Sequence, residues 1–425
     1  MRFYRKTPLE LSGTTVRKSI PLDVSKGEDG GIAYSMDSSG GKLRSGIGAN
    51  ALELSALPEG ETLRAVFEAD GAYALYCESG KMYSQTARGL QESGIGFSKM
   101  PVSVRFYDGG EKVLLSDGAV SAVLDKNGTA QKEIVFSAAV FAYGRLWYCN
   151  DGLTLYFSEA GNVFNFESGI GLGGTIELSD RKGKIEKLVF FQNDIYIVRE
   201  YGVQKLEAYG DEKEFRVEDV FSCAKIYGQS AAATERTLFF LAEDGLHSYG
   251  DGKIADFAEH FLSEQTEVRG AASDGKYFLT AETSGNMRAL GVFDENTGGG
   301  YLVAENCTGL SDCSGKILFV LDGKGYEITR GGAFAGKVLR RVWQSAPVTP
   351  CGGRALLREL DVRARGALVI CVHSDEGNRS VCVPDGGKVC RALNLPGTHF
   401  TFRILAEDCQ VSALSALFLK GENVS

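Results

Sequence analysis

Proline, histidine and tryptophan are scarce in this chain, which has 8, 4 and 2 of them among its 425 residues. The histidines (His247, His260, His373 and His399) are scattered, and none has a second histidine or a cysteine at metal-site spacing. No G-x-S-x-G, P-loop or H-E-x-x-H pattern occurs. We therefore expect structural histidines and no metal, cofactor or catalytic residues.

The ten cysteines form no C-x-x-C pair, so no familiar zinc spacing can be written. Several lie in apolar runs, as Cys371 does, where a free cysteine behaves as a small buried hydrophobe. We interpret them as reduced core thiols of a protein synthesised in the cytoplasm. Disulfides are the alternative, with Cys307–Cys313 as the local candidate.

Long apolar runs are also missing. The basic start Met1–Lys6 is not followed by a stretch of 7–15 apolar residues, so we expect no signal peptide. No run approaches the ~18 residues of a membrane span. The net charge of −9 argues against a surface that grips DNA, because phosphate binding needs a basic excess.

Glycine, in contrast, is abundant at 54 residues, and it marks turns between short apolar runs. Asp-Gly, Asn-Asp-Gly and Ser-Gly pairs between such runs are strong hairpin signals. The strand–turn–strand units start near 61, 103, 137, 185, 229, 267 and 307, a period of about 41 residues. This period predicts a six- or seven-bladed β-propeller over 61–332 and disfavours a β-helix or stacked sandwiches.

Beyond Gly331-Gly332 the strand candidates no longer follow the 41-residue period. Their number and spacing predict a β-sandwich over 333–425. Alternation should bury Phe400, Phe402 and Ile404. Its seven strand candidates are Val338–Trp343, Leu356–Val362, Ala367–Val372, Ser380–Val383, Lys388–Leu393, Phe400–Ile404 and Val411–Leu419.

The first 60 residues are too poor in large apolar side chains to form a core of their own. Ser25–Gly48 alone contains seven glycines. We expect 1–60 to form an extended arm that lies on the propeller or on another subunit and is a candidate to close the ring.

The remaining polar clusters have ordinary structural explanations. Asn150-Asp151 and Asp322–Gly325 lack the spacing of a calcium loop and are interpreted as turns. The sialidase box Ser-x-Asp-x-Gly-x-x-Trp is absent. The basic residues Arg340, Arg341, Arg358, Arg363 and Arg365 are interpreted as the exposed faces of strands.

Three stretches resemble bacteriophage virion proteins of the tail-hub, nozzle and packaged-DNA-stabilisation type. The first is Asp29–Ile32 leading to Gly41–Arg44. The second is Leu155–Phe166, followed by Ile185–Leu206, although Val163 and Phe166 stand where those proteins have Pro and Trp. The third combines Trp343–Ser345, Leu360–Val362 and Phe400–Arg403, similar to a terminal sandwich.

The resemblance implies a non-enzymatic structural protein of a phage or prophage, located in the virion as part of the tail or head–tail connector. It implies a homo-oligomeric ring, a hexamer by analogy, that contacts portal, adaptor or tail components and lets DNA pass. Two alternatives stay open. One is a glycan-binding or glycan-cleaving propeller at a host-recognition tip. The other is a WD- or kelch-type scaffold, disfavoured because those repeat signatures are absent.

Overall fold

The computed structural model describes residues 3–8, 32–37, 42–169, 171–210, 212–258, 265, 267–282, 288–296, 299–313, 315–331, 333–345, 347–350 and 353–420. Within these ranges the chain is almost entirely β-strand and turn. Its helices there are two short 3-10 turns, η3 (Glu212–Glu214) and η4 (Gly228–Ser230). None of the described helices is long and apolar enough to cross a membrane.

Seven groups of four antiparallel strands, which we call blades 1 to 7, run from the axis outward. Six of them are separate four-stranded sheets, and blade 6 is part of a larger sheet. Blade 1 contains β6 (Leu63–Ala69), β7 (Ala72–Cys77), β8 (Lys81–Thr86) and β9 (Gly89–Gly96). Blade 2 contains β10 (Val102–Tyr107), β11 (Glu111–Ser116), β12 (Ser121–Asp125) and β13 (Gly128–Lys132). Blade 3 contains β14 (Ala138–Ala142), β15 (Arg145–Cys149), β16 (Thr154–Phe157) and β17 (Gly174–Glu177). Blade 4 contains β18 (Ile185–Phe191), β19 (Asp194–Arg199), β20 (Gly202–Glu207) and β21 (Arg216–Ser222).

Blades 5 and 6 follow the same plan, and blade 7 differs in its last strand. Blade 5 contains β22 (Ala232–Ala233), β23 (Leu238–Ala242), β24 (Gly245–Gly250) and β25 (Lys253–Ala258). Blade 6 contains β26 (Arg269–Ser273), β27 (Lys276–Glu282), β28 (Arg288–Asp294) and β29 (Gly300–Glu305). Blade 7 takes β30 (Cys307–Cys313), β31 (Lys316–Leu321) and β32 (Lys324–Thr329) from the end of the repeat and β5 (Gly48–Ala51) from the N-terminal arm.

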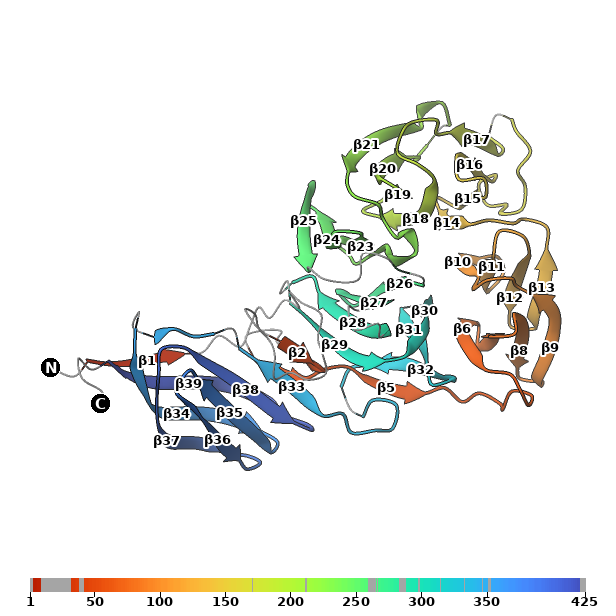
Figure 1. Cartoon of the computed structure of the whole chain (residues 1–425). Coiled ribbons are helices and arrows are strands. Elements are labelled where there is room, and N and C mark those ends of the chain that lie inside the picture. Colours follow the sequence, from red (N-terminus) through yellow and green to blue (C-terminus); the bar gives the residue numbers. More distant parts are fainter. Residues whose placement is uncertain are drawn as a thin grey trace.

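The seven blades close into a ring (Figure 1). Its seam lies between β30 of blade 7 and β6 of blade 1, which pack side by side. Two hydroxyl groups of β30 donate hydrogen bonds to carbonyls of β6: Thr308 Oγ1 to Arg64 O at 3.2 Å and Ser311 Oγ to Val66 O at 2.7 Å. Strand β5 completes blade 7 in antiparallel register, from Tyr326↔Ala51 to Thr329↔Gly48. The predicted propeller is confirmed, with seven blades.

The Asp-Gly turns form as their sequence requires. At the hairpin between β6 and β7, Asp70 and Gly71 both have positive φ, at 46° and 75°. Asp274-Gly275 and Asp322-Gly323 repeat this combination. Positive φ at both central residues matches the twist of the flanking strands, which is why Asp-Gly marks hairpins so well.

Residues beyond blade 7, together with strands of the N-terminal arm, form the predicted β-sandwich. One layer has the order β33 (Arg341–Gln344), β38 (Phe400–Ala406), β35 (Leu368–Ser374) and β36 (Gly377–Val383). The other has β3 (Met36–Asp37), β4 (Leu43–Ser45), β39 (Gln410–Lys420), β34 (Ala355–Arg365) and β37 (Lys388–Gly397), with β1 (Phe3–Pro8) pairing with β39. Phe400, Phe402 and Ile404 are fully buried, as alternation predicts.

The sandwich and the propeller share one sheet. Strand β2 (Ile32–Tyr34) pairs in parallel with β29 of blade 6 through Tyr34↔Leu302 and antiparallel with β33 through Ala33↔Trp343. This produces a nine-stranded sheet that runs from blade 6 into the sandwich. The described strands of the predicted arm are thus divided between the two domains, and five of the seven glycines of Ser25–Gly48 lie outside the described residues.

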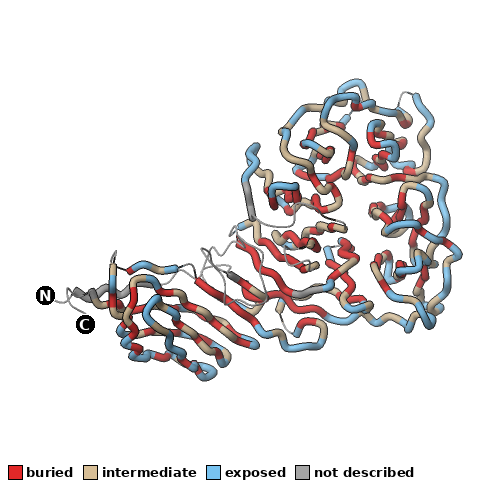
Figure 2. The backbone as a smooth tube through the Cα atoms, in the orientation of Figure 1, coloured by how far each residue is buried: buried red, intermediate tan, exposed pale blue. Residues whose placement is uncertain are grey.

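The hydrophobic core is likewise divided into clusters between the blades and a cluster shared with the sandwich. Separate hydrophobic clusters lie between successive blades from blade 7 round to blade 6, as between blades 3 and 4 around Trp147. A single larger cluster joins blades 6 and 7, the arm strands and the sandwich around Trp343. Figure 2 shows buried backbone positions both in the propeller and in the sandwich. Arg341 corrects one sequence prediction, because this side chain, expected on an exposed strand face, is buried at the junction.

Candidate functional site: the axial channel

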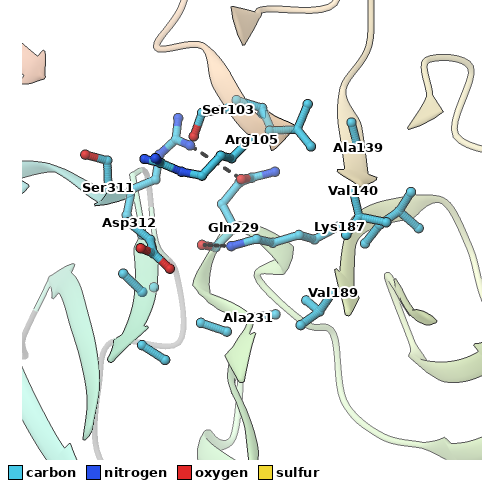
Figure 3. Close-up of a pocket in the computed structure, with 18 of the residues that line it drawn as sticks. Ser103, Arg105, Ala139, Val140, Lys187, Val189, Gln229, Ala231, Ser311 and Asp312 are labelled. Carbon is cyan, nitrogen blue, oxygen red and sulfur yellow. Dashed lines mark hydrogen bonds between the residues drawn. The ribbon is translucent and has the colours of Figure 1, made fainter. Parts of the chain in front are cut away.

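The innermost strands of the blades surround a cavity of about 420 Å³ on the propeller axis. Residues from β6, β10, β14, β18, β22, β26 and β30 all line it. Several lining residues are small, as at Ala139, Ala231 and Gly270. Longer polar side chains line the same cavity, among them Arg105, Lys187, Gln229 and Asp312 (Figure 3), and Arg269 lines it as well.

Lys187 reaches the cavity from β18. Its Nζ donates to the carbonyl oxygen of Gln229 at 3.3 Å. Among the described residues no carboxylate lies within ion-pair distance of this ammonium group. Burial, together with the positive charge of Arg269, lowers the pKa of Lys187 to about 7, while Asp312 opposes the shift. The charged form of Lys187 is therefore poorly compensated.

Arg269, on β26, is a second cation with neutral partners. It donates from Nη1 to Gln229 Oε1 at 3.4 Å and from Nη2 to the carbonyls of Met100 and Pro101 at 3.1 and 3.4 Å. Burial lowers the pKa of Arg269 to about 10, with Glu267 acting in the opposite direction. Gln229 thus bridges the two cations through its main-chain and side-chain oxygens.

Arg105 and Asp312 complete the charged lining. Alternation along β10 buries Val104 and Phe106 between blades 2 and 3 and leaves Arg105 on the opposite face. Its guanidinium donates to Glu111 and, at 3.3 Å, to the carbonyl of Glu68. Burial raises the pKa of Asp312, while the positive charges of Arg105 and Lys187 oppose the rise.

A second hollow of about 500 Å³ adjoins the first, since Gln229 and Arg269 line both. Its charges are balanced in number, because Arg64, Lys99 and Arg269 share this lining with Glu78, Glu186 and Glu267. Glu267 accepts from Arg64 Nη2 at 2.5 Å and from Arg288 Nη1 at 3.0 Å. Arg269 lies at the boundary of the two hollows, and the excess of cations over carboxylates is found in the first cavity.

Aromatic side chains reach the rim of this cavity. Phe190, which lines it, is 42% exposed and packs edge-on against Tyr143 with ring centroids 5.5 Å apart. Tyr143 also contacts Tyr209, which is 85% exposed, at 6.1 Å. We call Tyr143, Phe190 and Tyr209 the aromatic patch.

None of these cations was predicted from the sequence, from which no site residue was expected. Their signal was an isolated basic residue inside or beside an apolar inner-strand run, as in Ile185–Phe191 for Lys187 and Val268–Ser273 for Arg269. Alternation alone does not tell such a residue from one on an exposed strand face, because the difference depends on where seven strands converge.

The residues that were considered for metal or redox chemistry are placed elsewhere. His247 contacts Asp244 Oδ1 through Nε2 at 2.7 Å and stacks on Phe240. Asp151 accepts from the amides of Leu153 and Thr154 at 2.8 and 2.7 Å, as a turn residue does. No group of three or more potential metal ligands occurs among the described residues.

Cys307 and Cys313 lie at opposite ends of β30. At about 3.3 Å per residue they are too far apart for a disulfide, so the local pairing kept as an alternative is wrong. Burial raises the pKa of the Cys307 thiol to about 12, which leaves it protonated at neutral pH.

Comparison with known proteins yields no family model and no curated protein that matches the chain. Solved structures do match. The extracellular domain of a one-component system from B. thetaiotaomicron aligns over 85% of this chain at 10% identity and TM-score 0.47, and this chain spans 58% of its length. BamB from Moraxella catarrhalis aligns over 77% of this chain and 98% of its own at 12% identity and TM-score 0.40. A gluconolactonase from Xanthomonas campestris aligns over 66% of this chain and 99% of its own at 12% identity and TM-score 0.40. At these values the similarities carry no conclusion about substrate or partner.

Proposed function

We propose that this chain is a structural protein of a phage or prophage virion that forms part of the tail or head–tail connector through contacts between subunits. The observation that carries the proposal is the shared nine-stranded sheet, in which β2 is hydrogen-bonded between blade 6 and the sandwich. A sheet and a core that cross the domain boundary fix the two domains at one angle, as a component that transmits force in an assembly requires.

The sequence resemblance supports the same proposal, because its three stretches fall in the arm, the propeller and the sandwich. In this function the chain is not an enzyme. It forms a homo-oligomeric ring, six copies by analogy, and contacts portal, adaptor or tail components. The net charge of −9 suits a wall past which DNA slides without being gripped.

The test is assembly with named partners. The full chain is purified and mixed with portal, adaptor and tail proteins encoded beside its gene, and mass is measured by light scattering over a wide concentration range. We expect a ring or a stoichiometric complex with at least one partner. A chain that stays monomeric at high concentration and binds none of them contradicts the proposal.

The alternative, a glycan-binding propeller at a host-recognition tip, is favoured by one observation. The cationic cavity has an exposed aromatic side chain, Phe190, at its rim. Aromatic rings pack against the apolar faces of sugars. A glycan array probed with the full chain tests this candidate, and an array without signal removes it.

A further inference from the structure

We propose that the axial cavity binds a small polyhydroxylated anion, a sugar acid or a sugar phosphate, whose anionic group lies between Lys187 and Arg269. This site is independent of the proposed role in assembly. The ligand would bind in the same cavity as in the glycan alternative, and the proposal specifies which chemical group the cavity recognises.

The first step of the argument is the charge of the cavity. Three cations, Arg105, Lys187 and Arg269, line it with one carboxylate, Asp312. Of these cations, Lys187 and Arg269 contact only neutral oxygens among the described residues. Both side chains are half-buried. Charges that are partly removed from water are normally paired, because desolvation without a partner is costly. An anionic ligand would supply the missing partner.

The second step is the size and shielding of the space. About 420 Å³ lies near the lower end of the range for ligand cavities and suits a molecule of monosaccharide size. Lys187 and Arg269 are half-buried in it, and reduced contact with water strengthens attraction between a cation and an anion. An arginine beside a lysine is a common way to hold a carboxylate or a phosphate.

The third step concerns the rest of the ligand. Asp312 enters the same cavity from β30, and its carboxylate accepts hydrogen bonds from hydroxyl groups. It would repel a second anionic group. Phe190 presents an apolar ring at the rim. A ligand with one anionic end and several hydroxyl groups satisfies both features, whereas a polyanion does not.

Charge at Lys187 also gives the site a pH dependence. The titratable and charged groups that face Lys187 are Arg269 on β26, Arg105 on β10 and Asp312 on β30. The pKa of Lys187 near 7 means that the ammonium form is present below pH 7 and lost above it. Anion binding should therefore weaken as the pH rises through neutrality, and binding should take up protons near pH 7.

The test is isothermal titration calorimetry on the full chain with glucuronate, glucose 6-phosphate, inorganic phosphate and neutral glucose. We expect glucuronate or glucose 6-phosphate to bind at least tenfold more tightly than glucose and phosphate. The affinity for glucuronate, whose carboxylate stays ionised across this range, should fall at least fivefold from pH 6 to pH 8.5. Lys187→Met should weaken binding at least tenfold and remove the pH dependence. Lys253→Met, at an exposed lysine outside the cavity, should change neither.

Lys187→Met removes an unpaired cation, so we expect its melting temperature to equal or exceed that of the parent chain, which separates lost binding from lost folding. Absence of binding by every anion, or equal binding by Lys187→Met, overturns the site. Phosphate binding as tightly as the sugar anions overturns the polyhydroxylated class. If an oligosaccharide with a terminal uronate binds with the same affinity as free glucuronate, the natural ligand is a glycan. If that oligosaccharide does not bind, the natural ligand is a free small molecule. These outcomes do not depend on the assembly measurements.

Discussion

Gly309 is the residue on which the seam of the ring depends most directly. It lies in β30 with φ of +62°, where the pairing with β31 shifts register between Thr308 and Ser311. A Cβ atom here would lie 2.1 Å from the carbonyl oxygen of Arg64 on β6. The neighbour is backbone and cannot move without moving blade 1.

We expect Gly309→Ala to lower the free energy of unfolding by more than about 3 kcal/mol, because positive-φ strain and a backbone clash add. The control is Gly71→Ala, since Gly71 has φ of +75° but no atom within 4 Å of the added carbon. That variant should lose only about 1–2 kcal/mol. Denaturant unfolding measures both, and equal losses would show that the close approach at the seam is unimportant.

Arg199 is a second residue whose role follows from its surroundings. It is fully buried and donates from Nη1 to Gln204 Oε1 at 2.8 Å and from Nε to the carbonyl of Gly183 at 3.0 Å, while Nη2 lies 3.2 Å from Asp180 Oδ1. Burial lowers the pKa of Arg199, and Asp180 opposes this. These contacts of Arg199 hold the loop before blade 4 against β19.

We expect Arg199→Met to cost about 3–5 kcal/mol of stability, because it leaves several polar groups of this loop without their partner. Arg216→Met is the control. Arg216 pairs with Glu218 at 2.7 Å but is 70% exposed, so its loss should change stability by less than about 0.5 kcal/mol. Thermal unfolding compares the two, and a similar small effect of both variants would contradict the network.

Residue-scale features were predictable where local periodicity decides them. Phe400, Phe402 and Ile404 are buried because alternation in one strand is enough to assign their face. Lys187, Arg269 and Arg341 were not recognised as buried or inward, because their environment is set by strands distant in sequence. For Arg341, the partner Ser35 is 306 positions away in the chain.

At the scale of elements, β5 is the strand that completes the ring. Its backbone amides alternate in direction: Ala49 N donates to Ala333 O on one side, and Leu52 N, just after the strand, donates to Gly325 O at the end of the β32 pairing. The amide of Asn50 therefore points toward β32 and that of Ala51 points away.

We expect Asn50→Pro to destabilise the chain by about 2–3 kcal/mol and to promote aggregation, because it removes a ladder hydrogen bond and uncovers the edge of β32. Ala51→Pro should be much milder, since its amide does not face β32. Denaturant midpoints and light scattering distinguish the two. Equal effects would mean that β5 is not needed to close blade 7.

The element order was largely predictable and the outermost strands were not. Hairpins with Asp-Gly turns gave the period of the blades because their turn geometry is local. Strand β9, with the polar sequence Gly89–Gly96, has no apolar alternation and was missed, as exposed outer strands usually are. Closure of the ring by the arm was foreseen as a possibility, but its register with β32 depends on contacts across the whole domain.

At the scale of the whole molecule, the junction between propeller and sandwich is organised around Ser35. Its amide donates to Leu302 O of blade 6 at 2.6 Å, and its carbonyl accepts from Gly46 N at 2.8 Å. Arg341 of β33 donates from Nη1 to the carbonyl and the hydroxyl of Ser35 at 2.8 and 2.7 Å, and from Nε to Glu407 O at 2.8 Å. One turn of the arm thus links both domains.

This arrangement predicts that the two domains unfold together, although a chain of 425 residues with two domains ordinarily shows separate transitions. Calorimetry of the parent chain should give one endotherm. Arg341→Met should cost about 2–4 kcal/mol at the junction, because the buried hydroxyl and carbonyl of Ser35 lose the hydrogen bonds from Arg341, and should resolve the endotherm into two. Arg340→Met changes the exposed neighbouring residue and should leave a single endotherm. Two transitions in the parent chain itself would mean that the shared sheet does not couple the domains, and the mechanical role proposed for the chain would lose the observation that carries it.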